Sequence, residues 1–417
     1  MLAGPRFACL QLLLERIKPP RTLRSPRKYQ VVFPPYLVFL VPWRFKFLHT
    51  LKLKDAMNDK REVPRSTLDG SATRRGFLKA SAASLAAVPI WEAIPRIASA
   101  SEASPRDNSK RLFEFVQIND THVQSPLSVA GDVKPPKTYA RANDKFTWWV
   151  DAVNREPRPN FIVAIGDLVH GGRLERLPGD FDQLKQLLKP LAPPLYTTLG
   201  NHEVVQNEGN PEYEAAYRKM FGDDRVSYTF EHGGILFVML NNAGAAVVKE
   251  DVIHARNAWL RGVLEKNTAK EKILCCHIPI IAVRNEKTLA ESFGFATFHA
   301  HDAELLELVD SHANSILAVL SGHLHLTGYA MRNGVPHISI AGTASYPSDF
   351  ARFVVFDNKI EMNVHQLPTD LNPAAPSLHG KPRHEHDFTD DTHATADEYQ
   401  RGRSDERRLT IPRKRTA

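Results

Sequence analysis

Residues 195–203 read Leu-Tyr-Thr-Thr-Leu-Gly-Asn-His-Glu, a short apolar strand that passes through one glycine into three polar residues. Four other predicted strands end in a similar way. Their polar ends are Asn-Asp-Thr-His at 119–122, Gly-Asp at 166–167, His277, and Gly-His-Leu-His at 322–325. Short apolar runs bounded by glycine and polar residues are typical of buried strands. The chain therefore places chemically active side chains after five separate strands.

Helical periodicity between these strands predicts an α/β domain. Apolar residues recur on one helical face at 139–154, 181–188, 254–266 and 302–311. Asn333-Gly334 is a hairpin signal, so we expect a mixed sheet and not a purely parallel one. In such folds ligands bind at the edge where the strands end. Eight side chains are expected to meet there: Asp120, His122, Asp167, Asn201, His202, His277, His323 and His325.

Carboxylate, amide and imidazole side chains suit divalent metals such as zinc, iron and manganese, with no thiolate needed. Seven ligands are too many for one tetrahedral ion, but they fit two ions that share a bridging carboxylate. Two metals roughly 3.5–4 Å apart can hold the attacking and leaving oxygens of an in-line displacement at phosphorus. The pattern therefore predicts a dimetal site.

The order Asp-x-His, Gly-Asp, Gly-Asn-His-Glu, a lone His and Gly-His-x-His resembles that of the calcineurin-like metallophosphoesterase superfamily over residues 111–367. The resemblance implies a four-layer α/β/β/α sandwich of two mixed sheets, with helices outside and the dimetal site at one sheet edge. It implies two divalent or trivalent metal ions (Fe, Mn or Zn). Their ligands would be Asp120, His122, Asp167, Asn201, His277, His323 and His325, with Asp167 bridging the two ions.

The resemblance also implies an activity. We expect a hydrolase that cleaves a phosphodiester or phosphomonoester by direct in-line attack of a metal-bridging hydroxide, with His202 as the catalytic acid. The substrate would be a small-molecule or lipid-headgroup phosphoester. A non-catalytic binding scaffold of the same fold is the alternative, although such scaffolds typically lose some of these residues. His170 stands where purple acid phosphatases carry a tyrosine; it either lines the site or packs structurally.

The net charge of +7 does not indicate nucleic-acid binding. Residues 1–100 carry 18 Lys and Arg against 6 Asp and Glu, whereas residues 101–417 carry 36 against 41. A basic footprint for nucleic acid should lie on the folded domain, and here the domain is mildly acidic. Three cysteines in 417 residues do not form a disulfide framework or a thiolate zinc site.

The ends of the chain carry further predictions. Residues 57–100 resemble a twin-arginine signal peptide, with Arg74-Arg75, a short apolar run and a small-residue cleavage site. The twin-arginine translocase would be a transient partner, and the mature protein would be periplasmic or extracellular in a bacterium. Residues 1–56 fit an over-extended start or a membrane-associating extension without a stable span. Residues 101–110 are expected to be a linker, and 368–417 a disordered polar tail.

Overall fold

The computed structural model describes residues 109–125, 139, 141–155, 157–204, 211–293, 302–373, 377–378, 381–382, 387–389 and 391–414. The predicted extension 1–56, the export signal 57–100 and most of the linker 101–110 lie outside these residues and stay predictions. Within the described residues, every helix is too short or too polar to cross a membrane.

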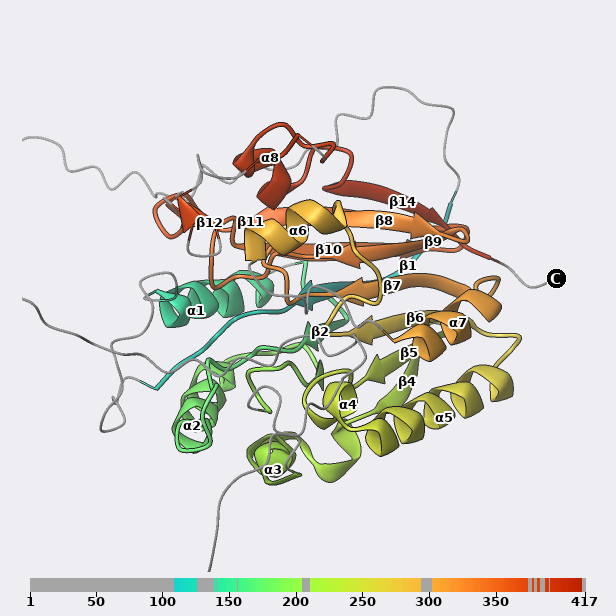
Figure 1. Ribbon diagram of the computed structural model, residues 1–417, viewed down its shortest axis with the longest axis horizontal. Coiled ribbons are helices and arrows are strands. Elements are labelled where there is room, and N and C mark those ends of the chain that lie inside the picture. Colours follow the sequence, from blue (N-terminus) through green and yellow to red (C-terminus); the bar gives the residue numbers. More distant parts are fainter. Residues whose placement is uncertain are drawn as a thin grey trace, which may run out of the picture. The chain divides into compact units, whose positions relative to one another are not determined.

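Two six-stranded sheets form the centre of the fold (Figure 1), with strand orders β14-β11-β10-β1-β2-β3 and β4-β5-β6-β7-β9-β8. The first sheet comprises β1 (Arg111–Ile118), β2 (Phe161–Ile165), β3 (Leu195–Thr198), β10 (Asp349–Phe356), β11 (Lys359–Gln366) and β14 (Arg408–Pro412). The second comprises β4 (Tyr228–His232), β5 (Ile235–Leu240), β6 (Glu271–Cys276), β7 (Ile316–Ser321), β8 (Gly328–Arg332) and β9 (Val335–Ser339). A small separate pair is formed by β12 (Ser377–Leu378) and β13 (Lys381–Pro382).

Both sheets are mixed, as the hairpin signal predicted. β1 pairs with β2 in parallel and with β10 antiparallel, and β9 pairs with β7 in parallel and with β8 antiparallel. Asn333 and Gly334 join β8 to β9 with φ angles of 49° and 71°, which a tight primed turn requires. β1 to β3 are mutually parallel, and so are β5 to β7. The polar ends of these strands therefore lie at one edge of each sheet.

Large apolar side chains fill the space between the two sheets. Phe115 of β1 stacks on Phe353 of β10 with 4.6 Å between ring centres, and it meets Phe237 of β5 edge-on at 5.2 Å. Successive side chains of a strand point to opposite faces. Phe113 and Phe115 therefore face this central layer, whereas Val116 faces the helices outside.

Helices cover the outer face of each sheet. On the first sheet these are α1 (Ala142–Val153), α2 (Leu177–Leu188) and α3 (Ala215–Phe221). On the second they are α5 (Glu250–Lys266) and α7 (Ala303–Ser311). The remaining helical segments are Pro211–Glu214, Asp223–Arg225, α4 (Ala245–Val248), α6 (Glu286–Phe293) and α8 (Ala396–Arg401). The predicted four-layer α/β/β/α architecture is confirmed.

The prediction of a disordered tail over 368–417 is wrong for residues 391–414. β14 pairs with β11 and extends the first sheet by one strand, and Ile411 joins the core between the sheets. Tyr399 of α8 is fully buried. The sequence of this segment looks disordered because it is highly charged, but its charges have specific partners; Arg413, for example, pairs with Glu271 of β6. The folded domain therefore extends well beyond residue 367.

Replacing Phe115 by alanine should lower the free energy of unfolding by about 3–5 kcal/mol, because the buried ring would leave a cavity between the sheets. Leu112→Ala on the same strand is the matched control. Leu112 is 41% exposed, so its loss should cost only about 0.5 kcal/mol. Urea unfolding followed by tryptophan fluorescence measures both variants, and equal losses would contradict the placement of Phe115 in the central layer.

Candidate metal centre

The predicted ligands leave their strands through an uncommon backbone conformation. Asp120, His122, Asp167, His323 and His325 all have positive φ angles, between 44° and 69°. Residues with a Cβ rarely adopt this left-handed region, and holding them there costs conformational energy. Such strain persists only where the surrounding fold imposes it. The backbone is therefore strained at the strand ends where the predicted ligands lie.

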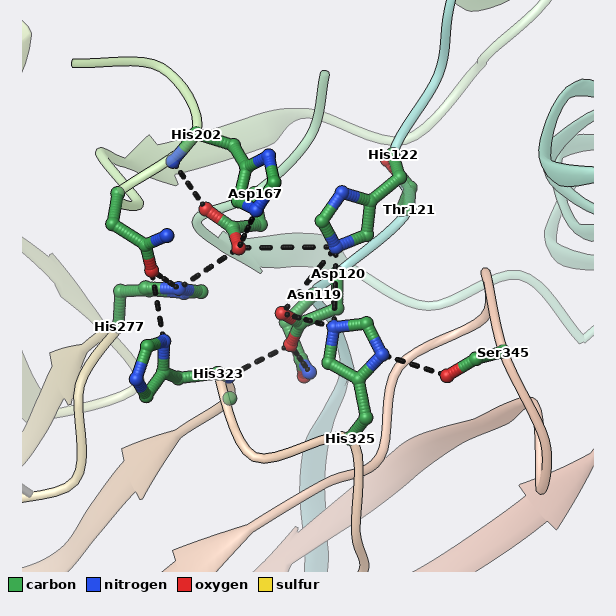
Figure 2. A network of polar contacts seen from close by, with 12 residues as sticks. Asn119, Asp120, Thr121, His122, Asp167, His202, His277, His323, His325 and Ser345 are labelled. Atoms are coloured by element: carbon green, nitrogen blue, oxygen red, sulfur yellow. Dashed lines mark hydrogen bonds and ion pairs between the residues drawn. The ribbon is translucent and has the colours of Figure 1, made fainter. Parts of the chain in front are cut away.

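Asp120, His122 and His325 form a first group of ligands (Figure 2). Nε2 of His122 and Nε2 of His325 are 3.1 Å apart. Oδ1 of Asp120 lies 3.1 Å from Nε2 of His325 and 3.9 Å from Nε2 of His122. Burial, aided by the neighbouring His202, holds the pKa of His122 well below its usual value. Its ring is therefore neutral, which is the form that binds a metal.

Asn201, His277 and His323 form a second group. Oδ1 of Asn201 lies 3.2 Å from Nε2 of His277 and 2.8 Å from Nδ1 of His323. The other ring nitrogen of His277, Nδ1, donates to the backbone oxygen of Ile165 at 2.9 Å. A donor bond of this kind fixes the orientation of the ring and leaves Nε2 to face the site.

Asp167 lies between the two groups, as Figure 2 shows. Its Oδ2 is 3.3 Å from Nε2 of His277 and 3.8 Å from Nε2 of His122. Burial alone would raise the pKa of Asp167, but the adjacent His277 and His202 outweigh burial and hold it well below its usual value. Asp167 is therefore an ionised carboxylate within reach of both ligand groups.

Glu203 is a functional residue to which sequence reasoning assigned no role, although it ends the quoted 195–203 stretch. Its buried carboxylate accepts hydrogen bonds from the backbone N–H groups of Asp167 (2.9 Å), Leu168 (2.5 Å), Val169 (3.1 Å) and Gly200 (2.7 Å). Burial and the nearby Asp167 raise the pKa of Glu203 to about 7, while the N–H donors oppose that rise. Glu203 thus holds the loop after β2 against the loop after β3.

Asn119 and Ser345 also support the ligands, and neither was predicted from the sequence. Nδ2 of Asn119 donates to Oδ2 of Asp120 at 2.6 Å and to the backbone oxygen of Ile340 at 2.7 Å. Oγ of Ser345 lies 2.7 Å from Nδ1 of His325. Asn119 stands inside a recognised motif and could have been noticed. Ser345 carries no sequence signal, because it lies 20 residues after its partner, beyond β8 and β9.

The glycines before the ligands have two different roles. Gly166 has a φ of 72°, as expected for a turn that a side chain would strain. Gly200 and Gly322 are not in this region; they are required because the chain is crowded. A Cβ on Gly200 would lie 2.2 Å from the backbone nitrogen of Asp167, and one on Gly322 would lie 2.5 Å from Oδ2 of Asp120. Crowding, and not an unusual backbone angle, therefore accounts for Gly200 and Gly322.

His202 lies beside both groups but is oriented differently from the ligands. Its Nδ1 is 2.5 Å from the backbone oxygen of His170, and its Nε2 is 4.0 Å from Oδ2 of Asp167. The side chain is 23% exposed, whereas that of His122 is fully buried. The His170 ring is 5.6 Å from the ring of His202 and 5.9 Å from that of His122, so His170 lines the site.

The residues present fit two metal ions. Two triads, Asp120 with His122 and His325, and Asp167 with His277 and His323, each place their ligand atoms within 4.8 Å of one another. Oδ1 of Asp120 is buried and accepts no hydrogen bond from any described residue. Metal–ligand bonds of roughly 2.0–2.2 Å bring ligand atoms to about 3 Å from one another, close to the spacings found here. Imidazole, carboxylate and amide ligands suit zinc, iron or manganese.

Two ligand groups around one central carboxylate form a candidate site for two metal ions. A comparison with family models agrees. Residues 113–326, just over half of the chain, match the calcineurin-like phosphoesterases. The chain belongs to this family.

Two relatives and one solved structure illustrate the likeness. The serine/threonine-protein phosphatase CPPED1 of Bos taurus is 29% identical over 188 residues, which cover 42% of this chain and 56% of that protein. The "Probable glycerophosphodiester phosphodiesterase GpdQ" of Arcobacter nitrofigilis is 24% identical over 234 residues, which cover 56% and 78%. The structure of a dimetal phosphatase from Danio rerio aligns with 62% of this chain and 97% of that chain, with a TM-score of 0.47 and 18% identity. The chain thus spans little more than half the length of the bovine relative.

Asp167→Asn should remove both metal ions, because it replaces the charged carboxylate between the two ligand groups by a neutral amide. Asp182→Asn, the same change at an exposed position of α2, should leave the metal content unchanged. Elemental analysis of the purified proteins after dialysis measures the metal-to-protein ratio. Two equivalents of metal retained by Asp167→Asn would show that Asp167 does not bridge.

Proposed function

We propose that this protein hydrolyses a phosphodiester or phosphomonoester by direct attack of water at phosphorus, with His202 as the catalytic acid. The position of His202 supports this role most directly. It lies beside both ligand groups and is 23% exposed. It belongs to neither of the two triads that contain an aspartate; the third group that could hold an ion, His122 with His170 and His202, contains no carboxylate. A side chain in this position can reach a substrate that is bound at the metal centre.

The hydrogen bond to the backbone oxygen of His170 explains how His202 could act as an acid. A carbonyl oxygen can only accept a hydrogen bond, so Nδ1 of His202 carries a proton. It donates a hydrogen bond to the backbone oxygen of His170, with 2.5 Å between the two atoms. Nε2 is then the nitrogen that gains or loses a proton, and it lies on the side of Asp167. A proton held on Nε2 can pass to the departing alkoxide oxygen of the ester.

The other residues would position the reaction. Bound metal ions would lower the pKa of a water and take up the charge of the phosphate oxygens. Asp167 and the histidines of both groups would hold those ions, and Glu203 would keep Asp167 in place through its backbone bonds. Ser345 contacts Nδ1 of His325, whereas Nε2 of that ring faces the other ligands, so this serine lies behind the ligand and direct attack by water is favoured over a covalent intermediate.

The substrate is proposed as a small-molecule or lipid-headgroup phosphoester. The name of the bovine relative denotes a phosphomonoesterase and that of the bacterial relative a phosphodiesterase, so both reactions stay candidates. Turnover of bis-p-nitrophenyl phosphate against p-nitrophenyl phosphate by the metal-loaded protein separates them. A non-catalytic scaffold would hydrolyse neither ester, although it would still bind metal.

His202→Ala should lower kcat by roughly 10²–10⁴-fold, because it removes a general acid. Its metal content should equal that of the wild type, since His202 is not a ligand. The loss should shrink as the pKa of the leaving alcohol falls, because a better leaving group needs no proton. A series of substituted phenyl and alkyl esters measures this slope, and an equal loss for every leaving group would refute the acid role.

We also propose that the protein is exported by the twin-arginine pathway to the periplasm or beyond. Its metal ligands are spread from Asp120 to His325, so the centre forms only when the domain is folded. A pathway that carries folded cargo suits such a protein.

Changing both Arg74 and Arg75 to lysine should leave active precursor in the cytoplasm, as cell fractionation and activity assays would measure. Unchanged export of this variant would exclude the pathway.

A further inference from the structure

The loop 322–327 after β7 has two sides, and its side chains alternate between them. His323 and His325 face the metal centre (Figure 2). Leu324 and Leu326, by contrast, are fully buried in a separate cluster with Val283, Leu289 and Tyr399. Tyr399 lies in α8, near the C-terminal end of the chain, and Leu289 lies in α6; Figure 1 shows these helices at the same end of the domain. The ligand loop is therefore packed on one side against the C-terminal segment.

Thr327, at the end of this loop, is bonded through every polar atom it has. Its N–H donates to the backbone oxygen of Gln400 at 2.8 Å. Its backbone oxygen accepts from Nη2 of Arg284 at 2.7 Å, and its hydroxyl donates to Oδ2 of Asp349 at 2.7 Å. A Cβ on Gly402 would lie 2.6 Å from the same backbone oxygen, so the end of α8 passes very close to the loop.

Each side-chain partner of Thr327 is in turn held by the C-terminal segment. Nη1 of Arg284 pairs with Oε1 of Glu406 at 2.6 Å, and both side chains are buried. Arg407 donates to both oxygens of the fully buried Asp349, at 2.7 and 3.0 Å. Removing one member of a buried ion pair leaves its partner charged and without compensation. Loss of Glu406 would therefore leave the buried charge of Arg284 without compensation, and loss of Arg407 would do the same to Asp349.

His393 closes this network within the C-terminal segment. Its Nδ1 is 2.6 Å from Oδ1 of Asp391 and its Nε2 is 2.7 Å from Oε2 of Glu406. Burial lowers the pKa of His393, but the bonds to the two carboxylates outweigh burial and raise it overall. A protonated His393 satisfies both carboxylates, so Glu406 is fixed in the position in which it holds Arg284.

A second path leads from α8 to His325. The hydroxyl of Tyr346 donates to Asp397, and Nε2 of Gln400 donates to the backbone oxygen of Tyr346 at 3.2 Å. Tyr346 directly follows Ser345, whose Oγ contacts Nδ1 of His325 at 2.7 Å. Helix α8 therefore supports the ring of His325 through Ser345, on its Nδ1 side, in addition to its contact with Thr327.

We propose that residues 391–414 form a C-terminal clamp that positions the ligand loop 322–327, and that the metal centre releases its ions readily when this clamp is loosened. The family match ends at residue 326, so the clamp lies outside the matched part of the chain. The inference rests on the proposed dimetal site. Residues of the clamp are positioning residues, since none of them is a predicted ligand.

The test compares the rate of metal release from Tyr399→Ala with that from Phe115→Ala. Both changes remove a fully buried aromatic ring, but only Tyr399 packs against the ligand loop. The metal-loaded proteins are mixed with excess chelator under conditions in which circular dichroism shows both to be folded. Loss of a group that orients metal ligands typically weakens metal binding by about 10–100-fold, so Tyr399→Ala should release its ions faster by a similar factor. Phe115→Ala should stay within about twofold of the wild type.

Thr327→Val is a second, nearly isosteric variant for the case in which Tyr399→Ala does not fold. It removes the hydroxyl bonded to Asp349 and should also release metal faster than the wild type. Thr197→Val is its control, since that buried hydroxyl contacts Tyr217 in the outer layer instead. Release from both Tyr399→Ala and Thr327→Val at the rate of their controls would overturn the clamp alone. A wild-type protein that binds no metal would overturn the dimetal function and the clamp together.

Discussion

The carboxylate of Asp167, which follows a strand of the first sheet, has to reach ligands that follow strands of the second sheet. Asp167 follows β2 in the first sheet, whereas His277 and His323 follow β6 and β7 in the second, and Oδ2 of Asp167 is 3.3 Å from Nε2 of His277. This approach is possible only while the distance between the sheets is fixed. Protein cores are packed as densely as organic crystals and deform little. The packed layer between the sheets, taken as a whole, therefore keeps the ligand groups of the two sheets within reach of each other.

The strained backbone of the predicted ligands also has to be held in place by neighbouring residues. Five predicted ligands have left-handed backbone angles, and such angles persist only where neighbouring bonds impose them. Glu203 provides four such bonds to the loops after β2 and β3, and Asn119 provides others to Asp120 and Ile340. Outer residues of this kind orient the ligands and tune their chemistry. The ligands alone therefore describe only part of the site.

Part of the support for the ligands comes from sequence beyond the family match. Ser345 and Asp349 both follow residue 326, as do Glu406 and Arg407 in the C-terminal segment. The family segment thus contains the ligands, and the following residues contain many of the groups that hold them. A charged segment can fold in this way because each buried charge meets an opposite charge, as Arg407 meets Asp349.

The sequence by itself determined the repeating strand and helix pattern, the mixed sheets and the candidate ligands. These rest on local signals: periodicity, a hairpin dipeptide, and polar residues directly after apolar strands. Tertiary structure alone decided that Glu203 and Ser345 support the ligands, that crowding requires Gly200, and that residues 391–414 are folded. The physical reason is that these features depend on partners far away in the chain. Ser345 contacts a ring 20 residues earlier, and Arg407 contacts a carboxylate 58 residues earlier, and no local pattern specifies such pairs.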